Sequence, residues 1–188
     1  MRKADFGSFH AYCPRCGHPL VIWPRVGSTH PICSNCGHVR YRNPAVGVAV
    51  VLQDEEGRVL MGRRARGDYA GHWCIPCGYV EWDEDVRAAA KREFREETGL
   101  VVETEEVLAV HSNFHNREKQ TVGIWFRGRV AGGKLEPLDG EFTALKWCDP
   151  ADPPVLAFPT DALVLKQLAE DGERQRGRAS LGPELSGQ

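Results

Sequence analysis

The stretch from Gly78 to Leu100 constrains the fold of this chain most, because it puts acidic side chains where a helix is expected to bury apolar ones. At about 100° per residue, the apolar helix face formed by Val86, Ala89 and Ala90 continues into glutamates. These are Glu93, Glu96 and Glu97, while the opposite arc carries Arg87, Lys91 and Arg95. The inward face of the predicted helix therefore changes from apolar to acidic.

This acidic face predicts a metal site. An acidic run in a helix is more often a solvated face, but here basic residues already occupy the outer arc, and Gly99 stands where a helix C-cap is expected. Clustered carboxylates repel one another, and acids in the last turn oppose the helix dipole by roughly 0.3 to 1 kcal/mol each. A divalent cation resolves this conflict, and oxygen ligands suit Mg²⁺ or Mn²⁺. We therefore expect metal-assisted attack on a phosphate, with Arg92 orienting Glu96 through an ion pair.

The same residues resemble a known family signature. The Nudix hydrolase box requires a glycine, five residues, a glutamate, seven residues and then Arg-Glu-apolar-any-Glu-Glu-any-Gly-apolar. Every position is met, by Gly78, Glu84, Arg92, Glu93, Phe94, Glu96, Glu97, Gly99 and Leu100. The resemblance implies a hydrolase of nucleoside diphosphates linked to another group, with Glu96 and Glu97 as metal ligands and Glu93 as a ligand or base.

The approach to the box also resembles the family pattern, with one departure. Trp73, Pro76 and Gly78 match, but Cys77 replaces the first glycine of the usual pair. In relatives the backbone carbonyl of that residue can bind metal, so the carbonyl of Cys77 is a candidate ligand, although cysteine lacks glycine's conformational freedom. Cys74 and Cys77 also form a Cys-x-x-Cys pair, and the family match around them disfavours a redox role.

Two further residues are candidates through the same resemblance. Glu141 lies six residues before Trp147 and matches the downstream acid that binds metal or acts as a base in several relatives; an exposed turn glutamate is the equal alternative. Arg64 ends an expected strand where relatives place an arginine that contacts phosphate, a task that suits a guanidinium.

Four of the seven cysteines form two identical Cys-x-x-Cys-Gly motifs, at residues 13–17 and 33–37. Four thiolates on two tight turns complete the tetrahedron that structural Zn²⁺ prefers. The motifs therefore predict a zinc site formed by Cys13, Cys16, Cys33 and Cys36. Two disulfides or two redox motifs are the alternatives, and the symmetric spacing disfavours both.

Composition indicates a globular chain of 188 residues, 41% hydrophobic and 27% charged, with room for one core and a small appendage. Residues 1–44 hold six of the 24 Lys and Arg and one of the 26 acids, which leaves 18 against 25 elsewhere. Nucleic-acid binding by this mildly basic segment stays open. No apolar run could span a membrane and no signal-peptide pattern is present, so we expect a cytoplasmic protein without a membrane partner.

Residue patterns predict a mixed sheet between helices. The expected strands are 45–53, 58–64, 101–114, 120–130 and 145–148, and a closing helix is expected at about 161–169. The resemblance implies an α/β fold of the Nudix type, an α/β/α sandwich with a mixed sheet, preceded by a small four-cysteine zinc ribbon. We expect the ribbon at residues 1–42, the Nudix domain at 43–170 and a disordered tail at 171–188.

The substrate is narrowed only by resemblance. Residues 36–50 (CGHVRYRNPAVGVAV) are similar to the junction in zinc-ribbon Nudix proteins, which include NADH pyrophosphatases and plant-type FAD pyrophosphatases. The Ser-Gln-Pro-Trp stretch of the NADH group is absent, and so is the proline that follows the box in one type of ADP-ribose pyrophosphatase. We expect cleavage of a small FAD-, ADP-ribose- or NADH-type substrate, with the FAD group as the best pointer. A nucleotide-sensing or RNA-binding protein with weak or no hydrolysis is the alternative, and the resemblance also allows for a homodimer.

Overall fold

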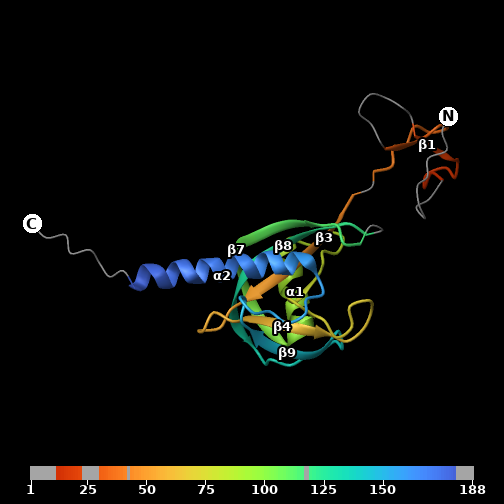
Figure 1. Cartoon of the computed structure of the whole chain (residues 1–188). Coiled ribbons are helices and arrows are strands. Elements are labelled where there is room, and N and C mark those ends of the chain that lie inside the picture. Colours follow the sequence, from red (N-terminus) through yellow and green to blue (C-terminus); the bar gives the residue numbers. More distant parts are fainter. Residues whose placement is uncertain (1–11, 23–29, 42, 117–118, 181–188) are drawn as a thin grey trace, which may run out of the picture. The chain divides into compact units, whose positions relative to one another are not determined.

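The chain forms two compact units, Met1–Asn43 and Pro44–Gln188. The computed structural model describes residues 12–22, 30–41, 43–116 and 119–180 (Figure 1). From the sequence we expected the boundary after residue 42. Parts of the predicted ribbon, at residues 1–11, 23–29 and 42, lie outside the described residues.

In the smaller unit, β1 (Leu20–Ile22) pairs antiparallel with β2 (Pro31–Cys33). The buried cluster of its described residues consists of Cys13, Leu20 and Cys33. So small an apolar cluster contributes little stability, and domains of this size usually need a further support such as a metal. The cysteines are the groups available to provide it.

Two sheets form the centre of the larger unit. The first is mixed and has the order β6 (Cys77–Tyr79), β3 (Ala45–Leu52), β8 (Thr121–Gly133) and β7 (Leu100–Asn113). Within it, β3 runs parallel to β8 and antiparallel to β6, and β7 is antiparallel to β8. The second sheet is antiparallel, in the order β5 (Trp73–Cys74), β4 (Val59–Arg64) and β9 (Phe142–Cys148).

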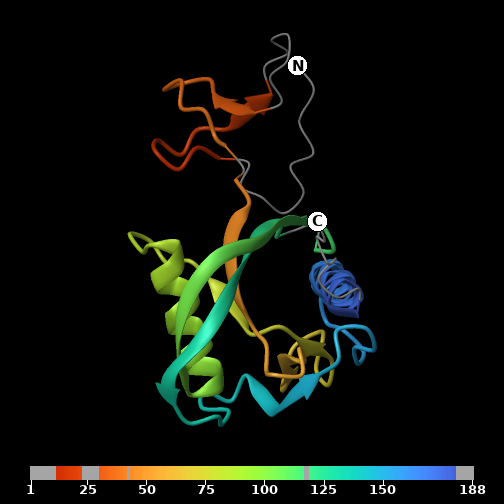
Figure 2. The same ribbon diagram turned by 90° about the vertical axis from the view of Figure 1, so that its left-hand side faces the viewer.

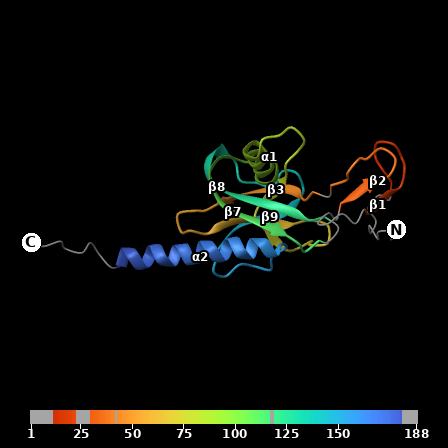
Figure 3. The same ribbon diagram turned by 90° about the horizontal axis from the view of Figure 1, so that it is seen from above.

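Two helices, α1 (Val86–Thr98) and α2 (Pro159–Ser180), lie on opposite sides of these strands (Figures 2 and 3). Alternation along β3 explains the arrangement, because successive side chains of a strand point to opposite faces. Val48 and Val50 belong to the buried cluster that includes α1, whereas Ala49 and Val51 belong to the cluster that includes α2. The predicted α/β/α sandwich with a mixed sheet is confirmed.

Helix α1 is bounded by a strong signal at each end. The Asp85 carboxylate accepts hydrogen bonds from the N–H groups of Arg87 at 2.9 Å and Ala88 at 3.2 Å, which caps the N-terminus. Gly99 has φ of 74° and its N–H donates to the carbonyl of Arg95 at 2.8 Å. Glycine adopts this left-handed backbone conformation readily, and it is the usual residue at the end of a helix. These caps fix which residues of the acidic stretch are helical.

Helix α2 differs from the sequence prediction, because it extends to Ser180 rather than ending near residue 169. Residues 171–180 are therefore helical where a disordered tail was expected, and residues 181–188 lie outside the described residues. Charges four residues apart favour the extension: Glu170 lies 3.9 Å from Lys166 and 3.4 Å from Arg174. Within the described residues, no helix is long and apolar enough to cross a membrane.

Truncation of Phe94, which is 1% exposed and belongs to the core between α1 and the sheet, should destabilise the protein. We expect Phe94→Ala to lower the free energy of unfolding by about 3 to 5 kcal/mol, because it removes a buried ring and leaves a cavity. Urea denaturation followed by circular dichroism measures this change. The neighbouring Arg95→Ala, at an exposed position, is the control and should change stability by less than about 0.5 kcal/mol. Equal effects of the two substitutions would contradict this packing.

Candidate active site

A cavity of about 370 Å³ opens beside the central strand β3. Its lining comes from β3, β4, β6, α1, β8 and the start of α2. Four of the residues predicted from the sequence line it: Arg64, Cys77, Glu93 and Glu141. The larger unit therefore brings together residues that lie far apart in the sequence.

Glu97 is the most deeply buried acid of α1, at 1% exposure. Neither of its carboxylate oxygens has a hydrogen-bond partner in the described part of the chain. Burial, followed by the nearby Cys77 and Glu141, raises the pKa of Glu97 well above its usual value, and the Cys77 backbone N–H opposes this only in part. A buried carboxylate without a donor is costly, and a cation beside it would remove that cost. These orphaned oxygens fit the predicted divalent metal.

Arg92 holds the other acids of the box. Its guanidinium lies 2.8 Å from Glu84, 2.9 Å from Glu93 and 3.2 Å from Glu96, and it donates to the carbonyl of Tyr79 at 3.2 Å. The hydrogen bonds from Arg92 lower the pKa of Glu84 to about 2. With this many partners, Arg92 acts as a positioning residue for the acidic turn.

Glu93 rests directly on the backbone of β6. A Cβ added to Gly78 would lie 2.0 Å from the carboxyl carbon of Glu93, so only glycine leaves room for this side chain. Both residues line the cavity. This close approach gives a physical reason for the glycine that opens the box.

The three box glutamates do not share one buried face, as the helix pattern had suggested. Glu97 is buried, Glu93 is half-buried and Glu96 is exposed. Glu96 lies about 100° around the helix from Glu97, which turns it out of the core. Glu93 and Glu96 instead contact Arg92, and the three carboxylates form no metal-sized group among the described residues. Their role as metal ligands stays a prediction.

Backbone pairing places Glu141 next to Arg64. The N–H of Ala65, just after β4, donates to the carbonyl of Glu141 at 2.8 Å, and Arg64 pairs with Phe142 in β9. Glu141 also contributes to the raised pKa values of both Arg64 and Glu97, so it lies near both groups. The structure thus brings this downstream acid to the site.

Arg64 has a side chain suited to bind a phosphate. Its Nε is buried without a hydrogen-bond partner among the described residues. Burial of the guanidinium lowers the pKa of Arg64. The nearby Cys74, Cys77 and Glu141 outweigh this effect and raise the pKa of Arg64, so the group stays charged. A charged guanidinium at a cavity wall, with its Nε unpartnered among the described residues, is a ready donor for phosphate oxygens.

Cys77 replaces the usual glycine without backbone strain. Among the described non-glycine residues, Asp83 alone has a positive φ, so Cys77 needs no glycine-like conformation. The cysteine therefore fits the local backbone, and it pairs with Ala49 of β3 in regular register. The Cys74 thiol and burial raise the pKa of Cys77 well above its usual value, which disfavours a reactive thiolate.

Sequence reasoning missed Asp161, in the first turn of α2. This residue lines the cavity and is 2% exposed, and its Oδ2 accepts a hydrogen bond from the N–H of Ile75 at 3.1 Å. Burial raises the pKa of Asp161 to about 7. From the sequence alone, an acid at the start of a helix is expected only to interact favourably with the helix dipole. The informative contact joins residues 86 positions apart, which no local pattern indicates.

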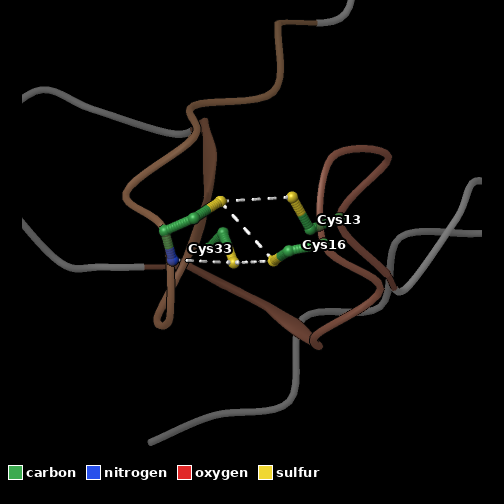
Figure 4. Close-up of side chains that lie close together, drawn as sticks. Cys13, Cys16 and Cys33 are labelled. Atoms are coloured by element: carbon green, nitrogen blue, oxygen red, sulfur yellow. Dashed lines mark hydrogen bonds between the residues drawn. The ribbon is translucent and has the colours of Figure 1, made fainter.

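In the smaller unit, the four predicted cysteines gather into one cluster. Their ligand atoms all lie within 4.8 Å of one another, and Figure 4 shows the sulfurs of Cys13, Cys16 and Cys33 converging from two turns. The sulfur separations are 3.6 Å for Cys13 and Cys36, 3.4 Å for Cys16 and Cys33, and 3.5 Å for Cys16 and Cys36. All are free thiols. A tetrahedron with metal–sulfur bonds of about 2.3 Å has edges near this length, so the cluster fits zinc.

Two matching turns build this cluster. In the first, the N–H of Cys13 donates to the carbonyl of His18 at 2.7 Å, and that of Gly17 donates to Cys13 at 2.9 Å. In the second, Cys33 and Gly37 make the equivalent bonds at 2.9 and 3.0 Å. The backbone at His38 lowers the pKa of the Cys36 thiol. The neighbouring thiols and desolvation outweigh this effect and raise the pKa of Cys36 to about 12. Four thiolates this close together need a cation.

Comparison with known proteins identifies the family. Residues 43–168, more than half of the chain, match the NUDIX domain. The chain therefore belongs to the Nudix family, as the box predicted. A crystal structure of a NUDIX hydrolase from Nitrosomonas europaea superimposes with a TM-score of 0.74 at 28% identity, over 88% of this chain and 93% of that one.

Several curated relatives are similar to part of the chain. A MutT-like protein of Streptomyces ambofaciens is 38% identical over 106 residues, which are 56% of this chain and 64% of that protein. An ADP-ribose pyrophosphatase of Methanocaldococcus jannaschii is 30% identical over 66% of this chain and 73% of its own length. An RNA pyrophosphohydrolase of Dinoroseobacter shibae is 36% identical over 55% and 76%, respectively.

Replacement of Asp161 by asparagine should show how much the burial of this acid costs, because the cost depends on pH. The unfolded chain releases this proton near pH 3.8, whereas the folded protein retains it to about pH 7, so ionisation lowers stability as pH rises between these values. We expect Asp161→Asn to gain about 2 to 3 kcal/mol of stability relative to wild type between pH 5 and pH 8. Urea denaturation of both proteins at the two pH values measures the difference. A difference that does not change with pH would contradict a buried, titrating Asp161.

Proposed function

We propose that this protein hydrolyses the diphosphate linkage of a nucleoside diphosphate derivative of the FAD, ADP-ribose or NADH type, with Mg²⁺ or Mn²⁺, and releases mononucleotides. The unpartnered, buried carboxylate of Glu97 beside a cavity lined by Arg64, Glu93 and Glu141 carries this proposal. Relatives named as an ADP-ribose pyrophosphatase and an RNA pyrophosphohydrolase support the reaction type.

The divalent cation would be held by Glu93, Glu96, Glu97 and the backbone carbonyl of Cys77. When bound, Mg²⁺ or Mn²⁺ neutralises charge on phosphate oxygens and makes a water easier to deprotonate. Glu93 and Glu96, which now contact Arg92, would hold the cation instead when it is bound. Arg92 keeps its pair with Glu84, so the turn stays in place.

The remaining steps use side chains on the cavity wall. Arg64 binds a substrate phosphate and keeps the diphosphate in line with the attacking water. The oxygen of that water forms a bond to one phosphorus as the bond from this phosphorus to the bridging oxygen breaks. The proton of the water passes to a carboxylate, Glu93 or Glu141, and the bridging oxygen leaves with the other phosphate. The products are AMP and the phosphorylated remainder of the substrate.

In the smaller unit, we assign Zn²⁺ to Cys13, Cys16, Cys33 and Cys36. Its role is structural, because four thiolates leave no position for substrate.

Substitution of Glu97 by glutamine should abolish hydrolysis and leave the fold intact. Glutamine keeps the shape but removes the charge that attracts the metal, so we expect kcat to fall by at least about 100-fold. The measurement is mononucleotide release from FAD, ADP-ribose, NADH and capped RNA, with Mg²⁺ or Mn²⁺. Stability should not fall, because glutamine fills the same space as the acid and carries no charge.

Glu56→Gln, at an exposed position in the turn between β3 and β4, is the matched control and should retain full activity. Hydrolysis of no candidate by the wild-type protein, despite nucleotide binding, would point to the sensing alternative. Undiminished hydrolysis by Glu97→Gln would show that the buried acid has no part in the reaction.

Zinc content tests the cysteine cluster. We expect about one zinc per chain by elemental analysis of the purified protein, and little zinc in Cys36→Ser, because three thiolates hold the metal less well. Cys148→Ala removes a buried thiol outside the cluster and should keep the zinc. A zinc-free wild-type protein with disulfides among these cysteines would overturn the assignment.

A further inference from the structure

The smaller unit has a sheet face that its own core does not use. The strands β1 and β2 lie beside a third segment, residues 39–41, which completes a small sheet. This segment is held against β2, because Val39 pairs with Ile32 and the N–H of Arg40 donates to the carbonyl of Pro31 at 2.8 Å. The three segments together present two faces.

The register of the strands separates these faces. Leu20 and Cys33 stand opposite each other and belong to the buried cluster that includes Cys13. The next pair along the strands, Val21 and Ile32, lies on the other side, because successive side chains of a strand point to opposite faces. The core thus occupies one side of the sheet, and the side of Val21 and Ile32 is called the open face.

Aromatic rings lie at two edges of the open face. Tyr12 pairs with Pro19, which lies two residues before Val21 and therefore on the same side. At the other edge, the ring of Tyr41 lies beside that of His30, with centroids 4.8 Å apart. Both tyrosines are 62% exposed. The open face consists of Tyr12, Val21, His30, Ile32, Val39 and Tyr41.

The composition of the open face suits the stacking of flat rings. Burial of a tyrosine would stabilise so small a unit, yet Tyr12 and Tyr41 both stay outside its core. The half-buried Val21, Ile32 and Val39 lie between them. Exposed aromatic rings on a sheet are a platform on which unpaired nucleobases stack.

The charge of this segment favours a polyanion as the occupant of the open face. Residues 12–22 and 30–41 contain Arg15 and Arg40 but no Asp or Glu, and residues 1–44 hold six Lys and Arg against one acid. The segment stays positive even when the negative charge of a zinc–tetrathiolate cluster is included. A positive surface attracts a phosphate backbone, whereas an apolar protein partner gains nothing from that charge.

We propose that the open face binds a single-stranded nucleic acid. Its unpaired bases stack on the rings of Tyr12 and Tyr41, and the basic side chains of the segment attract its phosphates. Every base has a flat face, so this binding tolerates any sequence. The inference is independent of the proposed hydrolysis, because the cavity lies in the larger unit.

The test is fluorescence anisotropy with the full-length, zinc-loaded protein. The probes are single strands of RNA and of DNA of about 12 nucleotides, labelled at the 3′ end and carrying a 5′-hydroxyl group. Such strands have no diphosphate linkage, so binding is separated from hydrolysis. We expect a Kd of about 10 μM or tighter at low salt for at least one strand, and the tighter of the two identifies the natural ligand. Affinity should fall as salt rises.

Substitution of the two tyrosines separates stacking from charge. Tyr12→Ala and Tyr41→Ala should each weaken binding by about fivefold to 100-fold, because each removes a stacking ring. Tyr41→Phe keeps the ring and should bind within about twofold of wild type. Phe114→Ala is the matched control, because it removes a ring of similar exposure, 67%, from the larger unit, and it should bind like wild type. Zinc content equal to that of wild type shows that each variant keeps its fold.

Several outcomes would overturn the inference. These are no binding of either strand by wild type, equal affinity for a duplex of the same sequence, and unchanged binding in both alanine variants. Loss of binding in Tyr41→Phe as large as in Tyr41→Ala would also contradict stacking. A homodimer in sedimentation velocity that Tyr41→Ala dissociates, with no nucleic-acid binding, would assign the open face to a second copy of the chain instead. Binding as expected without hydrolysis of any dinucleotide would contradict the proposed function alone.

Discussion

The Glu97 carboxylate is buried without a hydrogen-bond partner among the described residues, and this is the constraint on which the rest of the site depends. Asp85 and Gly99 cap α1 at its two ends, and Ala90 and Phe94 anchor the helix in the core, so Glu97 cannot turn out to solvent without disturbing the helix. A stability-optimised core would avoid such a residue. The proposed divalent cation would remove this cost.

Much of this arrangement could be predicted from local sequence, and the reason is physical. The box lies within one helix and its flanking turns, so its spacing maps directly onto turns of α1. The paired cysteine motifs are also local, and the cluster they form is the one expected. The mixed sheet followed from strand patterns, although β5 and β6, at two and three residues, are too short for a pattern to reveal.

What escaped prediction depends on contacts distant in the sequence. The exposure of Glu96 follows from how α1 is rotated against the sheet, which the helix pattern limits only to an arc. The extra turns of α2 depend on the charge pairs of Glu170. The environment of Asp161 is formed by Ile75 and Trp125, which lie in other parts of the sequence and contact its side chain. A single sequence does not show which residues distant in the chain come into contact.

The two faces of the sheet have separate cores, one that includes Phe94 of α1 and one that includes Trp125 together with Val164 and Leu165 of α2. Alternate residues of β3 serve the two cores independently. Substitutions on the α2 side can thus reshape the part of the cavity wall that includes Thr160 and Asp161, while the packing of α1 against the sheet stays intact. Such a scaffold is inherently easy to retarget, since new selectivity does not require new chemistry.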